Sequence, residues 1–199
     1  QLAAILSPGT QLGVVVKSDA YGHGLVPCSR AFVEAGARWL IVNTVDEAAR
    51  LRAARIDAQL LVCGPLRAAQ AAEAVATGAR VVVYDRDVVE ALSTAAQATG
   101  RRVAVHLKVE TGTHRQGVPG PQAGAFARWI GGQPGLRLEA VCTHFADVED
   151  GEDHGFARQQ LEILDAARSA AQEAGAAALS WHSASSAAAL LLGESHGDL

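Results

Sequence analysis

Apolar and polar positions follow two alternating periods along the whole chain. Short β-branched runs typical of buried strands are each followed by a longer segment with the spacing of an amphipathic helix. The strands are expected at residues 12–17, 39–42, 59–63, 80–84, 102–109, 136–145 and 178–182. The helices are expected at residues 25–36, 44–54, 65–77, 85–100, 122–130, 155–175 and 185–192. The chain therefore consists of about seven strand–helix units with short connections.

Helix caps support this division. Thr44-Val45-Asp46-Glu47 forms a capping box at the start of one helix, and Asp85 can cap another that ends near Gly100. Repeated strand–helix units predict a parallel sheet with right-handed crossovers, either doubly wound or closed as a barrel. No glycine-rich dinucleotide loop follows the first strand, which argues against the doubly wound sheet. The short, evenly spaced strands favour an α/β fold of the (β/α)8 TIM type, truncated before its eighth strand.

Composition and charge exclude several kinds of partner. The chain has 199 residues, of which 49% are hydrophobic and 19% are charged, and its formal net charge is −4. Without a basic run it offers no footprint for nucleic acid or an anionic membrane, and no apolar run is long enough to span a bilayer. The three cysteines form neither a disulfide framework nor a zinc pattern. We therefore expect a cytoplasmic protein without a bound metal.

The ends of the chain indicate a fragment. It begins at Gln1 and contains no methionine, whereas a complete translation product would start with one. We therefore expect residues 1–199 to be part of a barrel domain whose own beginning and eighth strand lie outside this sequence.

Polar residues collect where the predicted strands end. The first strand ends in Lys17, which is either a lysine extended toward solvent or one held in a pocket, its amine free to form an imine. In a barrel the reactive groups lie at the carboxyl ends of the strands. The other strand-end clusters are Thr111–Arg115, Thr143–Phe145 and His182 with Ser185 and Ser186. We expect all of them to face one pocket.

The string Val-Val-Lys-Ser-Asp-Ala-Tyr-Gly-His-Gly, residues 15–24, resembles the cofactor-lysine signature of bacterial alanine racemases, VVKADAYGHG. Its departure is Ser18, where alanine is usual. The resemblance implies that Lys17 carries pyridoxal 5'-phosphate on its amine and that Tyr21 reaches the phosphate of this cofactor.

Residues 106–117, HLKVETGTHRQG, resemble the family's HLKxDTGMxRxG block, with Glu110 and Thr113 as departures. By this resemblance Lys108 matches a lysine that is often carbamylated, and Arg115 matches an arginine directed at the phenolic oxygen of the cofactor. A guanidinium there would stabilise the phenolate. Taken without the resemblance, Arg115 is a surface loop residue and Lys108 forms an ion pair, for example with Glu110.

Two further segments resemble family motifs. Thr143-His144-Phe145-Ala146 matches THFA, which implies that His144 lies near the pyridine ring. Residues 182–187, HSASSA, resemble HxANSA, which implies that Ser186 binds phosphate while His182 and Ser185 support it. Ser185 replaces an asparagine. Alternatively, His144 is structural and Ser186 is the N-cap of the following helix.

The resemblance implies an isomerase that interconverts L- and D-alanine and so supplies D-alanine for peptidoglycan. Removing the Cα proton and returning it on the other face needs two bases. Lys17 would serve one face, and a tyrosine from a C-terminal β domain of the partner subunit would serve the other. That domain is absent from this sequence. We therefore expect a homodimer of the full-length protein and an inactive isolated fragment.

Three alternatives remain open at this point. One is a non-catalytic pyridoxal-phosphate carrier built on a single barrel, and another is a serine or broad-specificity racemase with the same motifs. The third is a metal-dependent hydrolase using His144, Asp147 and His182, although the first strand lacks the histidine pair such enzymes use.

Overall fold

The structure is a computed structural model that describes residues 2–149, 153–176, 179–183 and 185–199. The chain forms two compact units. One, the first unit, comprises Gln1–Gln11, His106–Gly132 and Leu138–Leu199. The other, the second unit, comprises Leu12–Val105 and Gln133–Arg137. Each unit is described separately below.

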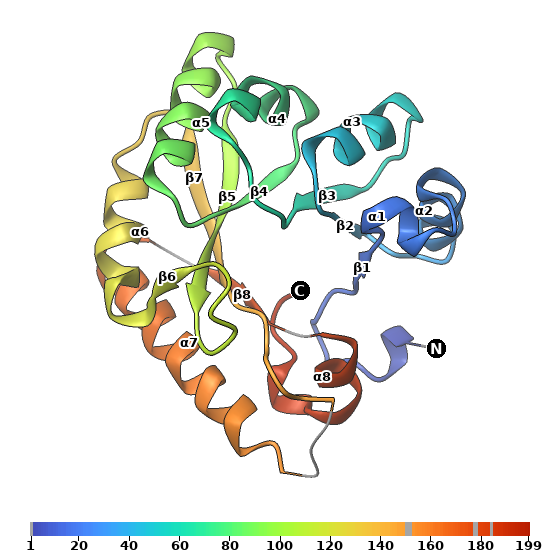
Figure 1. Cartoon of the computed structure of the whole chain (residues 1–199), viewed down its shortest axis with the longest axis vertical. Helices are drawn as coiled ribbons and strands as arrows, with labels where there is room; N and C mark the ends of the chain where they lie inside the picture. The colour runs from blue at the N-terminus through green and yellow to red at the C-terminus, as the bar shows by residue number, and fades with distance from the viewer. Residues whose placement is uncertain (1, 150–152, 177–178, 184) are drawn as a thin grey trace. The chain divides into compact units, whose positions relative to one another are not determined.

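The second unit contains four parallel strands joined through helices (Figure 1). The strands are hydrogen-bonded in the order β1 (Gly13–Val15), β2 (Trp39–Val42), β3 (Gln59–Val62) and β4 (Arg80–Val83). The register pairs Val14 with Leu40, Leu40 with Leu60, and Val62 with Val81. The intervening helices are α1 (Lys17–Tyr21), α2 (Leu25–Glu34), α3 (Val45–Ala53), the 3-10 turn η2 (Ala68–Gln70), α4 (Ala71–Thr77) and α5 (Arg86–Thr99).

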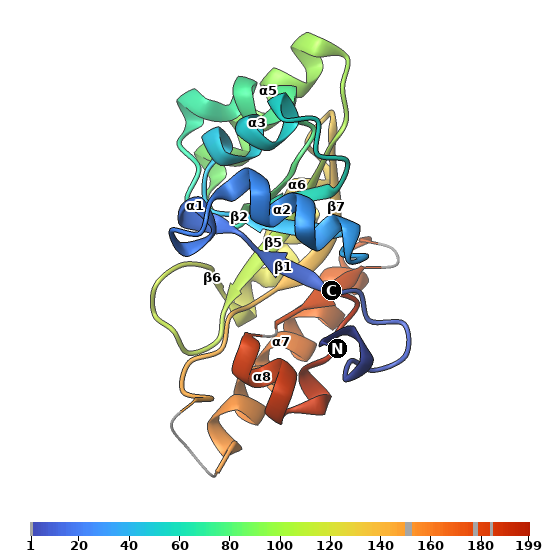
Figure 2. The ribbon, with the colours of Figure 1, turned by 90° about the vertical axis from the view of Figure 1, so that its right-hand side faces the viewer.

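The first unit contains the carboxyl-terminal parts of two long strands, β5 (Val103–Glu110) and β7 (Leu136–Cys142), which both begin in the second unit. Two short strands, β6 (Val118–Pro119) and β8 (Ser180–His182), pair in parallel with β5 and β7 respectively. The helices are η1 (Leu2–Ala4), η3 (Gly120–Gln122), α6 (Ala123–Gly131), α7 (Gly155–Glu173), α8 (Ser186–Leu191) and η4 (Gly193–Ser195). Figure 2 shows α7 and α8 from a second direction.

Helices α6 and α7 pack side by side at a glycine. A Cβ atom on Gly124 would lie 2.9 Å from the carbonyl oxygen of Ala170, so a larger residue would push the two helices apart. Leu107, Ile130 and Leu164, from β5, α6 and α7, are fully buried in this unit. In the second unit the fully buried side chains include Leu40, Leu60, Leu51 and Leu92. Burial of one face of each helix against the strands stabilises both units.

The strand order is β1-β2-β3-β4-β5-β7-β8, with β6 attached to β5. Strands that follow one another in the sheet as they do in the chain, with a helix after each, are typical of a (β/α)8 barrel. A doubly wound sheet reverses its order at a switch point. The predicted α/β fold, a truncated barrel, is confirmed.

Most predicted elements are present with shifted ends. The strand at 39–42, the capping box at Thr44 and the cap at Asp85 are confirmed. The strands predicted at 12–17 and 136–145 are too long, because β1 ends at Val15 and β7 ends at Cys142. The predicted helix 65–77 is a 3-10 turn followed by α4, and β6 was not predicted. The predicted start of the last strand, residue 178, lies outside the described residues.

The three cysteines, Cys28, Cys63 and Cys142, are not joined by disulfides. None of the helices in the described ranges combines the length and apolarity that a bilayer crossing requires.

Candidate functional site

Lys17 lies directly beyond the end of β1, where the backbone is firmly held. Val16 is fully buried, and its N–H donates to the carbonyl oxygen of Ile41 in β2 at 2.9 Å. The carbonyl oxygen of Val16 accepts from the N–H of Ala20, also at 2.9 Å. Lys17 itself is half-buried and is the first residue of α1. Lys17 therefore lies two residues beyond the last residue of β1, at the start of α1, and is not the end of the strand as predicted.

The turn α1 is left-handed. Ser18, Asp19, Ala20 and Tyr21 all have φ between 53° and 55°, and none of them is glycine. A left-handed conformation costs L-residues about 1–2 kcal/mol each, so a run of four requires compensation from its surroundings. Consecutive residues in this conformation concentrate at functional sites, where strain is retained because the geometry is useful.

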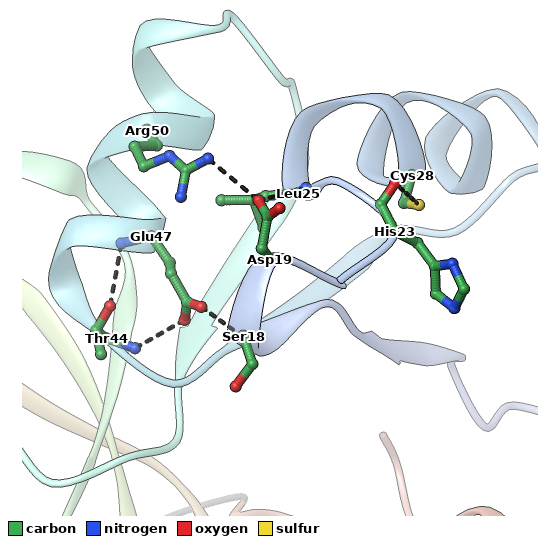
Figure 3. A network of polar contacts seen from close by, with 8 residues as sticks. All are labelled: Ser18, Asp19, His23, Leu25, Cys28, Thr44, Glu47 and Arg50. Atoms are coloured by element: carbon green, nitrogen blue, oxygen red, sulfur yellow. Dashed lines mark hydrogen bonds and ion pairs between the residues drawn. The ribbon is translucent and has the colours of Figure 1, made fainter. Parts of the chain in front are cut away.

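Polar contacts from outside the turn supply that compensation (Figure 3). The N–H of Ser18 donates to Oε1 of Glu47 at 2.6 Å. Oδ1 of Asp19 accepts from the N–H of Leu25 at 3.0 Å and from Nη2 of Arg50 at 3.2 Å. The hydrogen bond from Leu25, with a smaller contribution from Arg50, lowers the pKa of Asp19. Hydrogen bonds from outside the turn therefore hold it at its start, Ser18, and in its middle, Asp19.

Tyr21 ends the left-handed turn with 63% of its surface exposed. Its hydroxyl is therefore accessible from solvent. The structure thus brings Lys17 and Tyr21, two of the predicted site residues, into a single turn.

In the first unit, Glu110 at the end of β5 organises the loop that carries Arg115. Its carboxylate accepts hydrogen bonds from the N–H of Gly112, the hydroxyl of Thr113 at 3.1 Å and the N–H of Arg115 at 3.3 Å. Burial alone would raise the pKa of Glu110, but hydrogen bonds from His114, Gly112, Thr113 and Arg115 lower it. The side chain of Arg115 is exposed. The loop therefore has a fixed backbone and presents its guanidinium at the surface.

Gly117 closes this loop where no side chain fits. Its φ is +132°, and a Cβ atom there would lie 2.6 Å from the backbone nitrogen of Glu110 and 2.8 Å from the carbonyl carbon of Val109. Only glycine satisfies both requirements without displacing the end of β5.

The ends of β5 and β7 are joined by two buried threonine hydroxyls. Oγ1 of Thr143 donates to the carbonyl oxygen of Val109 at 2.9 Å and lies 2.7 Å from Oγ1 of Thr111. Because the Thr143 hydroxyl has a single proton, Thr111 must be the donor between the two hydroxyls. The N–H of Thr143 donates to the carbonyl oxygen of His182 at 3.1 Å, so the ends of β7 and β8 are joined as well.

A polar cluster is built from side chains of these three strands. Nδ1 of His106 lies 2.8 Å from Nε2 of His182, and Nε2 of His106 lies 3.1 Å from Oε2 of Glu139. Lys108 is buried on β5, two residues beyond His106. Burial, His106 and the positive charge of Lys108 together hold the pKa of His182 well below its usual range. His182 is therefore neutral at physiological pH.

The contact with Glu139 determines what His106 presents to His182. Nε2 of His106 donates its hydrogen to the Glu139 carboxylate in either charge state of the ring. A neutral His106 then accepts at Nδ1 from the Nε2–H of His182, whereas a protonated His106 donates from Nδ1 to Nε2 of His182. The charge of His106 therefore decides which nitrogen of His182 carries the proton.

The remaining predicted residues lie where the sequence placed them, with one correction. His144 follows Thr143 beyond the end of β7 and is half-buried. Ser186 is not the N-cap of α8, because Oγ of Ser185 accepts from the N–H of Ala188 at 3.3 Å. Ser186 is the first helical residue and its side chain is exposed. Ala184, which belongs to the same motif, lies outside the described residues.

Sequence reasoning missed three members of these groups. Glu47 was interpreted only as a helix cap, His106 only as part of a motif, and Glu139 was not considered. The carboxylate of Glu139, in the middle of a mostly apolar strand, was a usable signal, because such groups need a partner when they are buried. The predicted meeting of Lys17 and Tyr21 with the first-unit residues in one pocket stays a prediction.

No metal site is assembled from the candidate ligands. Over the described ranges, no three histidine, cysteine, aspartate or glutamate residues are grouped so that they could hold an ion. His144, Asp147 and His182, the set that a metal-dependent hydrolase would need, do not form such a group.

Comparisons with known proteins agree with the motifs. The family profile described as "Alanine racemase, N-terminal domain" matches residues 1–199. The alanine racemase of Desulfovibrio desulfuricans is 38% identical over 199 residues, which are 100% of this chain and 53% of that protein. The alanine racemase of Symbiobacterium thermophilum is 36% identical over 194 residues, which are 98% of this chain and 51% of that protein. The chain therefore spans about half the length of the curated relatives it matches.

Solved structures give the same result. The alanine racemase from D-cycloserine-producing Streptomyces lavendulae has a TM-score of 0.93 and 34% identity, over 100% of this chain and 52% of its own. The Clostridium difficile 630 alanine racemase in complex with cycloserine has a TM-score of 0.94 over 99% of this chain and 54% of its own. At 22% identity, the second match supports the fold alone.

Proposed function

The chain belongs to the alanine racemase N-terminal domain family, and from this premise we propose that its parent protein is a pyridoxal-phosphate-dependent racemase that interconverts L- and D-alanine. The observation that carries the proposal is the half-buried Lys17, which follows the hydrogen-bonded strand β1 and begins a strained left-handed turn. Strain of this kind is retained where a side chain must be aimed accurately.

The donor groups on this chain fit pyridoxal 5'-phosphate. Lys17 offers an amine for the cofactor aldehyde, and Tyr21 and Ser186 are exposed and offer hydroxyls for its phosphate. Arg115 offers a guanidinium for its phenolate oxygen, on a loop whose backbone Glu110 fixes. His144 is the residue proposed to face the pyridine ring. Lys108, His182 and Ser185 are proposed as supporting residues of this site, on β5, on β8 and at the start of α8.

The chemistry divides between the cofactor and the protein. When bound, pyridoxal phosphate supplies a sink for the electron pair left at Cα of the amino acid. Lys17 would move the proton at Cα on one face of the amino acid, because its amine is adjacent to the cofactor that it would hold. The left-handed turn restricts the direction of this amine. Neutral His182 adds no positive charge beside Lys108.

The second base lies outside residues 1–199 in this proposal. A tyrosine of a C-terminal β domain, supplied by the partner subunit of a homodimer, returns the proton on the opposite face. The isolated chain is accordingly proposed to be inactive. A cytoplasmic location and a role in supplying D-alanine for peptidoglycan belong to the same proposal.

Lys17→Ala in the full-length protein tests the function. We expect loss of both the visible absorption of the bound cofactor and the racemisation of L-alanine followed by polarimetry. Retention of racemisation would refute the proposal. Arg30→Ala, an exposed cation on the neighbouring helix α2, is the control that should retain both signals.

The same preparation separates the alternatives. A non-catalytic carrier would bind the cofactor through Lys17 without racemising any amino acid. A serine or broad-specificity racemase would turn over L-serine at a rate comparable with L-alanine. The relatives that match are alanine racemases about twice as long as this chain, which favours the racemase over a single-barrel carrier.

A further inference from the structure

The Glu47 carboxylate joins two separate segments of the second unit. Oε2 accepts from the N–H of Asn43 at 2.7 Å and from the N–H of Thr44 at 3.1 Å, both just before α3. Oε1 accepts from the N–H of Ser18 at 2.6 Å, which is the first left-handed residue after Lys17. Figure 3 shows this carboxylate lying between Thr44 and Ser18. Only 9% of Glu47 is exposed, so water competes little for these contacts.

Helix capping accounts for only part of this arrangement. A capping box consists of the Glu47 contact to the N–H of Thr44 and the reciprocal contact from the N–H of Glu47 to Oγ1 of Thr44, at 3.2 Å. Ser18 lies 29 residues before Glu47 and is not part of the start of the helix. Its bond is additional, and it is the shortest of those described for this carboxylate.

The Ser18 contact acts at the point where the turn leaves the strand. On one side of Lys17, the N–H of Val16 donates to Ile41 of β2. On the other side, Glu47 accepts from the N–H of Ser18, so the backbone of Lys17 is held between two fixed neighbours. Asp19 supports the middle of the turn through the N–H of Leu25 and an ion pair with Arg50, whose side chains are 51% and 57% exposed, so that the ion pair is weak.

We infer that Glu47 is a positioning residue for Lys17, which holds the left-handed turn so that the lysine amine keeps one direction. Glu47 acts through the backbone of Ser18 and touches neither substrate nor cofactor in this role. The inference rests on the proposed function of Lys17 for its catalytic meaning, but the anchoring itself is independent of it.

Two substitutions separate anchoring from capping. Glu47→Gln retains the size of the side chain but replaces one accepting oxygen with an NH2 group, which cannot face the N–H donors on both sides. Thr44→Ala breaks the other half of the capping box and leaves the Ser18 contact in place. A residue that only caps α3 would make the two variants equivalent.

The first measurement is amide hydrogen exchange of residues 16–24 in the full-length protein freed of cofactor. We expect Glu47→Gln to accelerate exchange at Ser18 by about tenfold or more, in line with the loss of one charge-assisted hydrogen bond. Thr44→Ala should leave it within about twofold of the parent, since the Ser18 contact remains. Equal acceleration in both variants, or none in Glu47→Gln, would overturn the inference.

The second measurement is the dissociation constant of pyridoxal phosphate, from quenching of protein fluorescence. Glu47→Gln should weaken binding by about tenfold while Thr44→Ala has little effect, because a mobile Lys17 loses its orientation. If Glu47→Gln does not fold, residue-resolved exchange in the parent protein decides. Protection of the Ser18 amide by about a hundredfold or more supports the anchor, and an unprotected amide refutes it.

Failure of the proposed function is recognised separately. If Lys17→Ala still racemises alanine, Lys17 is not the catalytic amine, whatever the exchange at Ser18 shows. If Lys17→Ala is inactive but Glu47→Gln behaves like Thr44→Ala in both measurements, the function stands and the positioning inference fails.

Discussion

Nδ1 of His106 lies 2.8 Å from Nε2 of His182, and this contact connects the end of β8 to a carboxylate on β7. The Nε2–H of His106 donates to Glu139, so a carboxylate orients the ring that meets His182. The strand-end histidine is therefore held by a side chain that has its own fixed partner. Such preorganisation is what a site built on strands can provide.

The stability of the protein should fall as the pH drops below about 6.5, the ordinary pKa of histidine. The folded state keeps His182 neutral because burial, His106 and Lys108 lower its pKa, whereas the unfolded chain takes up the proton. The unfolded state then binds more protons, so the free energy of unfolding decreases toward acid by at most about 1.4 kcal/mol per pH unit.

Urea denaturation of the parent and of His182→Gln between about pH 5 and pH 8 measures this effect. The variant should show a shallower loss of stability below about pH 6.5. His23→Gln, which changes an exposed histidine, is the control and should follow the parent. Parallel curves for the parent and His182→Gln would contradict the prediction.

Glu139→Gln should destabilise the first unit by about 1–3 kcal/mol, because it replaces the carboxylate that accepts from the buried ring of His106 with a neutral amide. The glutamine can present either an oxygen or an NH2 group to His106, so Nε2 of His106 is no longer held as a donor. Urea denaturation measures the loss, and the Nε2 chemical shift of His106 should change in the variant.

The matched control for this substitution is Glu194→Gln. Glu194 pairs with Arg158 at 2.6 Å, but both side chains are about half exposed. Its loss should therefore cost less than about 1 kcal/mol. A loss of stability in Glu139→Gln no larger than that in Glu194→Gln would contradict the prediction.

Local sequence signals predicted the elements whose cause is local. The strand Trp39–Val42, the capping box at Thr44 and the cap at Asp85 depend on side chains within a few residues of each other. The left-handed turn after Lys17 has no such signal, because serine, alanine and tyrosine do not favour positive φ and aspartate adopts it only as a single residue. Contacts from Glu47, Leu25 and Arg50 impose that conformation.

For the same reason, the sequence predicted individual residues of the candidate site but not the contacts between them. Motif resemblance identified Lys17, Arg115 and His182 one by one, since each lies in a recognisable string. The partnership of Glu139 with His106 joins residues 33 positions apart on different strands, and no local pattern encodes it. The β6 strand was missed because two residues are too few to show a period.

Thr143→Val should cost about 1–3 kcal/mol of stability, because the substitution leaves the Val109 carbonyl and the Thr111 hydroxyl without their buried partner. Adding Thr111→Val should cost little more, since it removes a hydroxyl that has already lost its acceptor. A double-mutant cycle from urea denaturation measures this coupling. Additive losses would mean that the two hydroxyls do not act together.

Gly117→Ala should be far more damaging than Gly100→Ala, although both glycines have positive φ. At Gly100, φ is +62° and a Cβ atom meets nothing within 4 Å, so alanine there costs about 1 kcal/mol of backbone strain. At Gly117, φ is +132° and the Cβ atom would lie 2.6 Å from the backbone nitrogen of Glu110, so roughly 3 kcal/mol or more is expected. Thermal unfolding of the two variants measures the difference.

Because relief of this clash must displace the end of β5, Gly117→Ala should also weaken pyridoxal phosphate binding through Arg115, while Gly100→Ala leaves it unchanged. Equal melting temperatures for the two variants would show that the loop after β5 yields easily and does not fix Arg115.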